Sequence, residues 1–226
     1  MTITYDFFDN FRHIETNAIL ICDNNHSTFK TLLEKFSSNL ATADKGSNTI
    51  NIGGKRIDIY QVIDKNNKTL LSYDIRENTI YEISEELPKL NWKIDYTDTK
   101  KINDYICNKA TVSFRGRNYT SWYTLKLPFS FGPWKFTGLP GLILEISDDT
   151  KTFKWAARKI QYPSNKNLSV PYKGTKAVTL KELIDIQNEN SKKLRARLRS
   201  IMPRGAVMNT PKNRRNGIEL VYEWEE

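Results

Sequence analysis

The sequence predicts a mainly β (α+β) protein, in which a curved antiparallel sheet or half-barrel of about eight to ten strands carries one or two packed helices. Apolar and polar residues alternate through much of the first two-thirds of the chain, as in Ile57–Ile63 and Trp92–Tyr96, which is typical of strands with one buried face. Clusters of turn residues, such as Gly53–Gly54 and Asp64–Asn67, separate these runs at hairpin spacing. Two other segments follow a helical period.

The first helical segment lies at residues 28–37, behind a serine and a threonine that are suited to cap it. Its apolar residues recur at i, i+3, i+4 and i+7: Phe29, Leu32, Leu33 and Phe36. The second segment begins with a capping box at Thr179–Glu182 and ends before Pro203, which predicts a longer helix over 179–202. Alternation in Gly217–Trp224 predicts a last strand that returns to the sheet.

The composition predicts a single globular domain over residues 1–226. Hydrophobic residues make up 38% and aromatic residues 12% of the chain, which is enough to bury a core and too aromatic for disorder. Its apolar runs are far shorter than the roughly 20 residues of a membrane-spanning helix, so we expect no membrane span. The N-terminus lacks the features of a signal peptide. We therefore expect a cytoplasmic protein if Met1 is the true start, and an exported one if a leader has been removed.

Positive charge is concentrated near the C-terminus. The formal net charge is +9, and residues 191–217 contain nine basic and no acidic residues. Residues 202–216 lack any periodicity and are rich in turn residues, which is typical of a mobile loop. The basic segment 191–215 suits nucleic acid or an anionic surface such as lipid or glycan, but no nucleic-acid reader motif accompanies it. Nucleic acid is therefore disfavoured as a partner.

The two cysteines, Cys22 and Cys107, lie 85 positions apart without metal-ligand spacing. Three interpretations remain open: two separate buried thiols, one disulfide that closes a long loop, and a reactive nucleophile at Cys107. The third is the weakest, because His13 and His26 lie in polar N-terminal stretches with no sign of pairing to a thiol. The sequence has no His/Cys cluster and no glycine-rich phosphate loop after a strand, so we expect neither a metal nor a cofactor.

Residues 105–149 are the densest in aromatic and turn-forming residues. Two alternating runs flank the basic turn Arg115–Asn118, which predicts a hairpin. A segment interrupted by glycines and prolines follows, and its last part is Gly138, Leu139, Pro140 and Gly141. Proline removes a backbone donor and glycine permits close backbone approach, so these four residues predict a tight turn that presents Leu139 as an anchor before strand Leu142–Ile146.

These residues resemble the signature of the GLPGLI family, a group of Bacteroidota proteins named for the hexapeptide that is intact at Gly138–Ile143. Four further motifs of the resemblance occur in order: Cys107–Ala110, Phe114–Arg117, Trp122–Tyr123 and Gly132–Phe136. The similarity is weaker at Ile3–Tyr5 and Asn216–Leu220. The resemblance implies a cell-envelope protein, periplasmic or secreted and made with a signal peptide, whose features the N-terminal residues do not show. It implies no settled activity.

Aromatic and basic residues of this block predict a ligand-binding face: Arg115, Arg117, Trp122, Tyr123, Trp134 and Lys135. Together they would line a concave sheet with an apolar floor and a cationic mouth, which suits a peptide, a lipid or another amphiphile. The alternative is that about half of the aromatic residues of the block fill the core, as aromatic residues in strands usually do.

An enzyme is the less favoured interpretation. Arginine near Cys107 would lower the pKa of its thiol and suit thiol-dependent peptide chemistry. The block contains no histidine, however, and a general base would have to come from Glu145, Asp148 or Asp149. The sequence therefore favours a binding module for a small amphiphile or peptide, or an accessory to an envelope protein partner.

Overall fold

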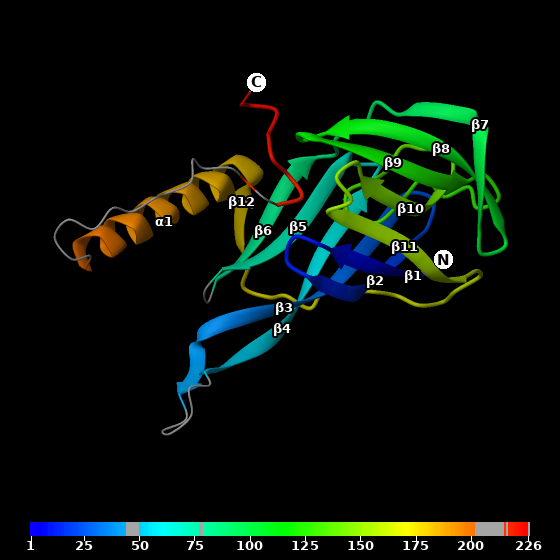
Figure 1. Ribbon diagram of the computed structural model, residues 1–226. Helices are drawn as coiled ribbons and strands as arrows, with labels where there is room; N and C mark the ends of the chain where they lie inside the picture. The colour runs from blue at the N-terminus through cyan, green and yellow to red at the C-terminus, as the bar shows by residue number, and fades with distance from the viewer. Residues whose placement is uncertain (44–49, 77–78, 202–214, 216, 226) are drawn as a thin grey trace.

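The computed structural model describes all residues except 44–49, 77–78, 202–214, 216 and 226. Within this part of the chain, a twelve-stranded sheet carries one helix, α1 (Leu180–Ile201) (Figure 1). The strands are β1 (Thr2–Asp9), β2 (Ile14–Cys22), β3 (His26–Ala43), β4 (Ile50–Asp64), β5 (Thr69–Arg76), β6 (Thr79–Glu86), β7 (Lys93–Ile102), β8 (Tyr105–Phe114), β9 (Arg117–Thr124), β10 (Leu142–Asp148), β11 (Phe153–Gln161) and β12 (Lys176–Thr179).

The strand order is β12-β6-β5-β4-β3-β2-β1-β11-β10-β9-β8-β7, with β12 and β7 at the two edges. Neighbouring strands are antiparallel except for β12, which runs parallel to β6. The sheet is therefore two runs of consecutive hairpins, β1–β6 and β7–β11, joined where β1 pairs with β11. The mainly β class and the packed helix near residues 179–202 are confirmed, and twelve strands exceed the eight to ten expected.

The predicted hairpin at Arg115–Asn118 is confirmed, with Phe114 of β8 opposite Arg117 of β9. Arg115 and Gly116 connect them, and both have positive φ, 45° and 82°. A two-residue connection of this kind matches the right-handed twist of the two strands. A Cβ at residue 116 would also lie 2.9 Å from the Cβ of Leu220, so only glycine fits.

The connection between β9 and β10 folds back onto the sheet and fills its core. Ile143 donates a backbone hydrogen bond to Phe131, and Phe131 pairs with Thr137 across an isolated bridge. In the predicted tight turn, Gly138 and Pro140 are exposed and Leu139 is buried. A Cβ at Gly141 would lie 2.1 Å from the carbonyl oxygen of Thr124. The tight turn therefore inserts Leu139 into the core and lets two backbone segments touch.

Two predicted elements are wrong. Residues 28–37 form part of strand β3, and the register of that strand with β2 and β4 places Phe29 and Thr31 on the buried face. Phe29 and Thr31 also fit a period of two, so pairing with two neighbouring strands overrides the helical spacing. Gly217–Trp224 is an irregular segment and forms no strand; Leu220 donates to the carbonyl oxygen of Arg115, 2.9 Å away.

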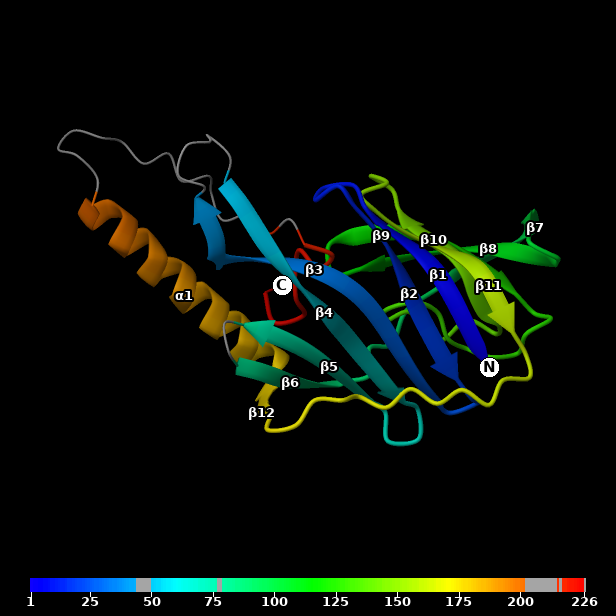
Figure 2. The same cartoon turned by 90° about the horizontal axis from the view of Figure 1, so that it is seen from below.

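Helix α1 begins with the predicted capping box. The backbone nitrogen of Thr179 donates to Glu182 Oε2 at 2.7 Å, and Glu182 donates its own backbone nitrogen to Thr179 Oγ1 at 3.2 Å. Leu180, Leu183 and Ile184 pack on β6, and the rest of the helix extends away from the sheet (Figure 2). The predicted mobile loop 202–216 lies outside the described residues apart from Arg215. In the described part of the chain, no helix has the length and apolar character needed to cross a membrane.

Candidate functional site

A cavity of about 990 Å³ lies against one face of the sheet. Residues of seven strands, β1 to β6 and β11, line its floor, most of them at alternate positions because side chains two apart in a strand share a face. The floor residues include Trp155, Phe7, Phe29, Gln61, Ser72 and Ile83, which come from β11, β1, β3, β4, β5 and β6 in that order. Residues 134–135, the start of α1 and the C-terminal segment, which we define as residues 215 and 217–225, complete the walls.

The aromatic part of the floor lies near β1 and β11. Phe7 and Trp155 are cross-strand neighbours and their rings stack, with centroids 4.9 Å apart. The indole of Trp134, from the β9–β10 connection, lies parallel to that of Trp155, with centroids 6.3 Å apart and an interplanar angle of 6°. This end of the cavity therefore offers flat, apolar surfaces.

A polar pair interrupts the apolar floor further along the sheet. Phe29, Gln61, Ser72 and Ile83 lie opposite one another on β3, β4, β5 and β6, in a single row across the sheet. Gln61 is 6% exposed and Ser72 is 9% exposed. Gln61 Oε1 and Ser72 Oγ have no hydrogen-bond partner among the described residues. Buried polar groups are normally hydrogen-bonded, so this pair stands apart from the rest of the lining.

Four buried charges, which we call the charge ring, lie at the other end: Arg115, Lys135, Glu85 and Glu219. Arg115 Nη2 donates to Glu85 at 2.7 Å and Arg115 Nη1 donates to Glu219. Lys135 Nζ donates to Glu219 at 3.0 Å and also to Glu85. The side chains of Arg115, Lys135 and Glu85 are at most 5% exposed, and that of Glu219 is 15% exposed.

The charge ring favours the ionised forms of Glu219 and Arg115. Burial on its own would raise the pKa of Glu219, but the neighbouring charges of Lys135 and Arg115 lower it below the ordinary value for glutamate. Burial likewise opposes ionisation of Arg115, and the carboxylates of Glu219 and Glu85 raise its pKa instead. Two cations and two carboxylates therefore compensate one another in a site that water scarcely reaches.

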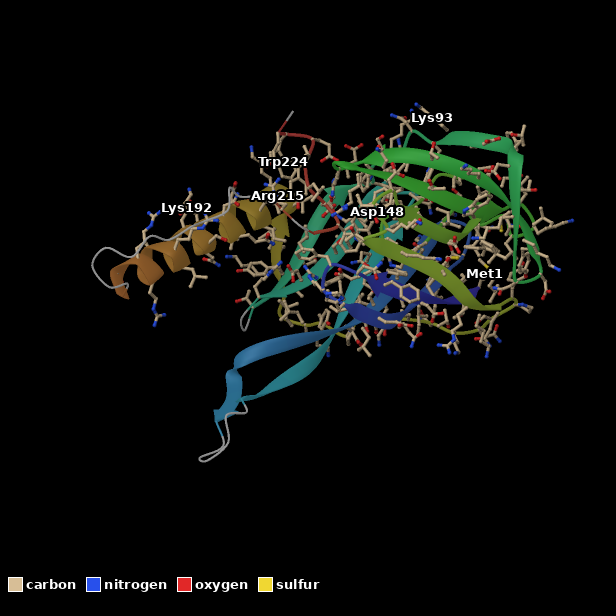
Figure 3. All side chains as sticks on the ribbon, in the orientation of Figure 1. Met1, Lys93, Asp148, Lys192, Arg215 and Trp224 are labelled. Atoms are coloured by element: carbon tan, nitrogen blue, oxygen red, sulfur yellow. The ribbon has the colours of Figure 1, made fainter. Side chains whose placement is uncertain are left out.

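The hairpin turn around Gly116 also anchors the C-terminal segment over the cavity. Arg117 Nη2 donates to the carbonyl oxygen of Gly217 at 2.9 Å, and Arg117 Nη1 pairs with Asp148 at the same distance. Tyr119 donates its hydroxyl to the carbonyl oxygen of Ile218 at 3.3 Å. In Figure 3, Arg215 and Trp224 lie near the beginning of α1, whereas Lys192 lies on the part of the helix that projects away.

The charges that line the cavity are balanced among the described residues. Four cationic and four acidic residues face it: Arg12, Arg76, Lys135, Arg215, Asp9, Asp74, Glu85 and Glu219. Beyond the charge ring, Arg12 Nη1 lies 3.7 Å from Asp9 Oδ2, and Arg76 Nε lies 2.7 Å from Asp74 Oδ2. Arg215 pairs with Glu225 in the C-terminal segment at 2.5 Å. The described mouth is therefore not the cationic one that the sequence suggested.

The structure brings together only some of the predicted ligand-binding residues. Trp134 and Lys135 line the cavity, and Arg115 and Arg117 lie behind its wall. Trp122 and Tyr123, on β9, lie outside the lining. Tyr123 is fully buried, and burial raises its pKa to about 12.

Sequence reasoning missed the polar pair and the acidic half of the charge ring. Gln61 carried a signal, because it is the one polar residue in the apolar series Ile57, Ile59 and Ile63, which steps by two. A polar residue within a buried face needs a partner or a function. Ser72 has no comparable local pattern. The two glutamates, Glu85 and Glu219, have none either, since their partners Arg115 and Lys135 lie far away in the sequence.

The two cysteines are free and buried, so the interpretation as two separate thiols is confirmed and the disulfide is not formed. Burial raises the pKa of Cys107 to about 11 and that of Cys22 to about 12. Cys107 Sγ contacts the carbonyl oxygen of Tyr105, and neither arginine of the hairpin lowers its pKa. Among the described residues, no group of three or more His, Cys, Asp or Glu residues is arranged to hold a metal ion.

In a comparison with known proteins, residues 115–145 match a family model described as "Protein of unknown function (Porph_ging)". That stretch contains the hairpin turn, Trp134, Lys135 and the hexapeptide, so it supplies one part of the cavity wall and half of the charge ring. No curated protein matches the chain.

Two solved structures of PNGF-II, in different space groups, have a similar fold. The first is 17% identical, with a TM-score of 0.57 over 81% of this chain and 32% of that chain. The second is 18% identical, with a TM-score of 0.53 over 79% of this chain and 30% of that chain. At these identities the likeness concerns the fold alone, and this chain spans about a third of those chains.

Proposed function

We propose that the protein is a binding module for a small amphiphile. The observation that carries the proposal is the cavity of about 990 Å³ on the sheet face. Ligand pockets have volumes of about 300–1,000 Å³ and are mostly apolar, with a few polar groups that orient the ligand. An aromatic surface at Trp134 and Trp155, together with the isolated polar pair Gln61 and Ser72, has this character.

The way the walls are held supports binding to a preformed site. The C-terminal segment is tied to the β8–β9 turn by the ion pair between Arg115 and Glu219 and by the backbone bond from Leu220. Residues 134–135 are tied to β6 through Lys135 and Glu85. Walls fixed before the ligand arrives reduce the entropic cost of binding.

Binding is favoured over catalysis by the state of the ionisable groups. A general acid at neutral pH needs a carboxyl group with a raised pKa. The pKa of Glu219, which faces the cavity, is lowered by its cationic neighbours. Cys107 lies outside the lining and the raised pKa of its thiol disfavours the thiolate.

We further propose that the chain belongs to the GLPGLI family and acts in the cell envelope, periplasmic or secreted, alone or as an accessory to an envelope protein. The hexapeptide Gly138–Ile143 lies inside the stretch that the family model matches, which supports this. We also propose that the open sheet is curved into a half-barrel around the cavity. Fractionation of the native cells tests the location: the protein is expected outside the cytoplasm, and recovery with cytoplasmic markers would contradict it.

A ligand-binding assay tests the proposed function. The protein, purified without detergent, is expected to keep a small-molecule adduct that native mass spectrometry detects. Alternatively, it is expected to bind an added ten-carbon amphiphile, and quenching of tryptophan fluorescence measures that binding. Thr31→Phe fills the cavity floor and should weaken binding at least tenfold, since Thr31 lines the cavity. Thr28→Phe, on the same strand with its side chain on the other face, is the matched control. Absence of any adduct together with no binding of any probe would refute the proposal.

A further inference from the structure

We infer that the cavity selects an uncharged amphiphile whose head group donates a hydrogen bond, and that Gln61 and Ser72 hold this head group. The inference rests on the proposed function and deepens it, because it names the chemistry of the ligand. Its basis is the polar pair, whose two residues line the cavity and whose Gln61 Oε1 and Ser72 Oγ atoms are buried without a partner among the described residues, and the balance of charge around it.

The sheet register places the two side chains within reach of one head group. Gln61 and Ser72 are direct cross-strand neighbours on β4 and β5, on the face that lines the cavity. The Cβ atoms of such neighbours lie about 4.5–5.5 Å apart, so a single hydroxyl or amide group can contact both. Phe29 and Ile83 flank the pair on either side in the row across the sheet.

One polar atom of each side chain in the pair has no hydrogen-bond partner among the described residues. Gln61 Oε1 is an acceptor, and Ser72 Oγ is both an acceptor and a donor. Burial of these atoms without partners costs free energy, and a ligand that donates to the amide oxygen and bonds the hydroxyl recovers it. A site built for such bonds discriminates strongly against a ligand that cannot make them, because its own polar groups then stay unpaired.

The charges of the lining disfavour a charged head group. Each described cation that faces the cavity already lies near a carboxylate: Arg12, Arg76, Lys135 and Arg215. A carboxylate or ammonium group that enters must shed its water and finds no unpaired counter-charge among the described lining residues, which makes its transfer unfavourable. An uncharged head group avoids this cost, while the apolar tail packs on Phe7, Trp134 and Trp155.

Three probes with equal ten-carbon chains test the selection: 1-monodecanoylglycerol, decanoate and decylamine, each below its micellar concentration. Tryptophan fluorescence follows the titrations, since Trp134 and Trp155 line the cavity. We expect the uncharged monodecanoylglycerol to bind at least tenfold more tightly than either charged probe.

Variants of the polar pair separate recognition from a structural role. Gln61→Leu and Ser72→Ala should each weaken monodecanoylglycerol binding about tenfold and leave the weak binding of decanoate unchanged. Because each removes an unpartnered buried group, the Tm of the unliganded protein should rise. Gln161→Leu and Ser147→Ala, which lie outside the lining, are the matched controls and should leave the affinity unchanged.

The outcomes distinguish the inference from the proposed function. If decanoate or decylamine binds as tightly as monodecanoylglycerol, the cavity binds amphiphiles and the inferred selectivity is wrong. If the Gln61 and Ser72 variants lower the Tm and keep full affinity, the pair is structural and the inference is also wrong. If no probe binds and no adduct is found, the proposed function itself fails.

Discussion

Two regions of the chain contribute to the same cavity in different ways. Residues 115–145 supply Trp134 and Lys135, and their buried cations Arg115, Arg117 and Lys135 all lie in ion pairs. Strands β3 to β6 supply a floor in which Gln61 and Ser72 have no partner. The difference indicates that the first region fixes the shape of the cavity and the second region recognises the ligand. A substitution in the first should therefore cost stability, and one in the second should cost affinity.

The largest effect is expected for Arg115→Met, which breaks the charge ring. It leaves Glu85 and Glu219 with Lys135 as their only buried cation, and removal of one partner from a buried ion pair costs about 3–5 kcal/mol. The free energy of unfolding from urea denaturation checks this. Arg158→Met is the control, since Arg158 is exposed and makes only long contacts of 3.4 Å to Asp6 and Asn17 among the described residues, and should change stability by less than about 1 kcal/mol. Equal effects of the two variants would show that the ring is not structural.

A smaller loss is expected for Gly141→Ala in the hexapeptide. The added Cβ would lie 2.1 Å from the Thr124 carbonyl oxygen, and overpacking of a filled core costs about 1–3 kcal/mol. Gly217→Ala is the matched control, because its Cβ would meet nothing closer than 3.8 Å. Thermal denaturation compares the two. A neutral Gly141→Ala would mean that the close approach of β9 and β10 is not needed.

The smallest effect is a pH dependence carried by Glu219. Its pKa is lowered in the folded protein from the ordinary glutamate value of 4.5, so its ionisation stabilises the fold above about pH 4.5. This contribution is lost as the pH falls from there through the folded-state pKa. The difference in unfolding free energy between the wild type and Glu219→Gln should therefore shrink between pH 7 and pH 3. A difference that stays constant would contradict the ionised state of Glu219 in the ring.

Much of the fold could be predicted from local patterns, because each strand has its own alternation and each turn its own residues. The hairpin at Arg115–Asn118 and the helix after Thr179 are of this kind. The prediction for residues 28–37 failed because Phe29 fits both a helical and a strand period there, and the outcome depends on β2 and β4. Local sequence does not contain that information.

The site could be predicted only in part, because it is assembled by long-range contacts. Trp134 and Lys135 were found through their aromatic and basic neighbours. Glu85 and Glu219, which neutralise the cations of the same block, come from β6 and the C-terminal segment. Without these partners, the sequence suggests a cationic mouth where the structure has paired charges.

The most direct test of the account is the place where an uncharged amphiphile binds. Addition of 1-monodecanoylglycerol to ¹⁵N-labelled protein should shift the side-chain amide resonances of Gln61 and the indole resonances of Trp134 and Trp155, because all three line the cavity. The indole resonance of Trp122, which lies outside the lining, should stay in place. Shifts at Trp122 with none at Gln61 would contradict the central claim that the cavity floor recognises the ligand.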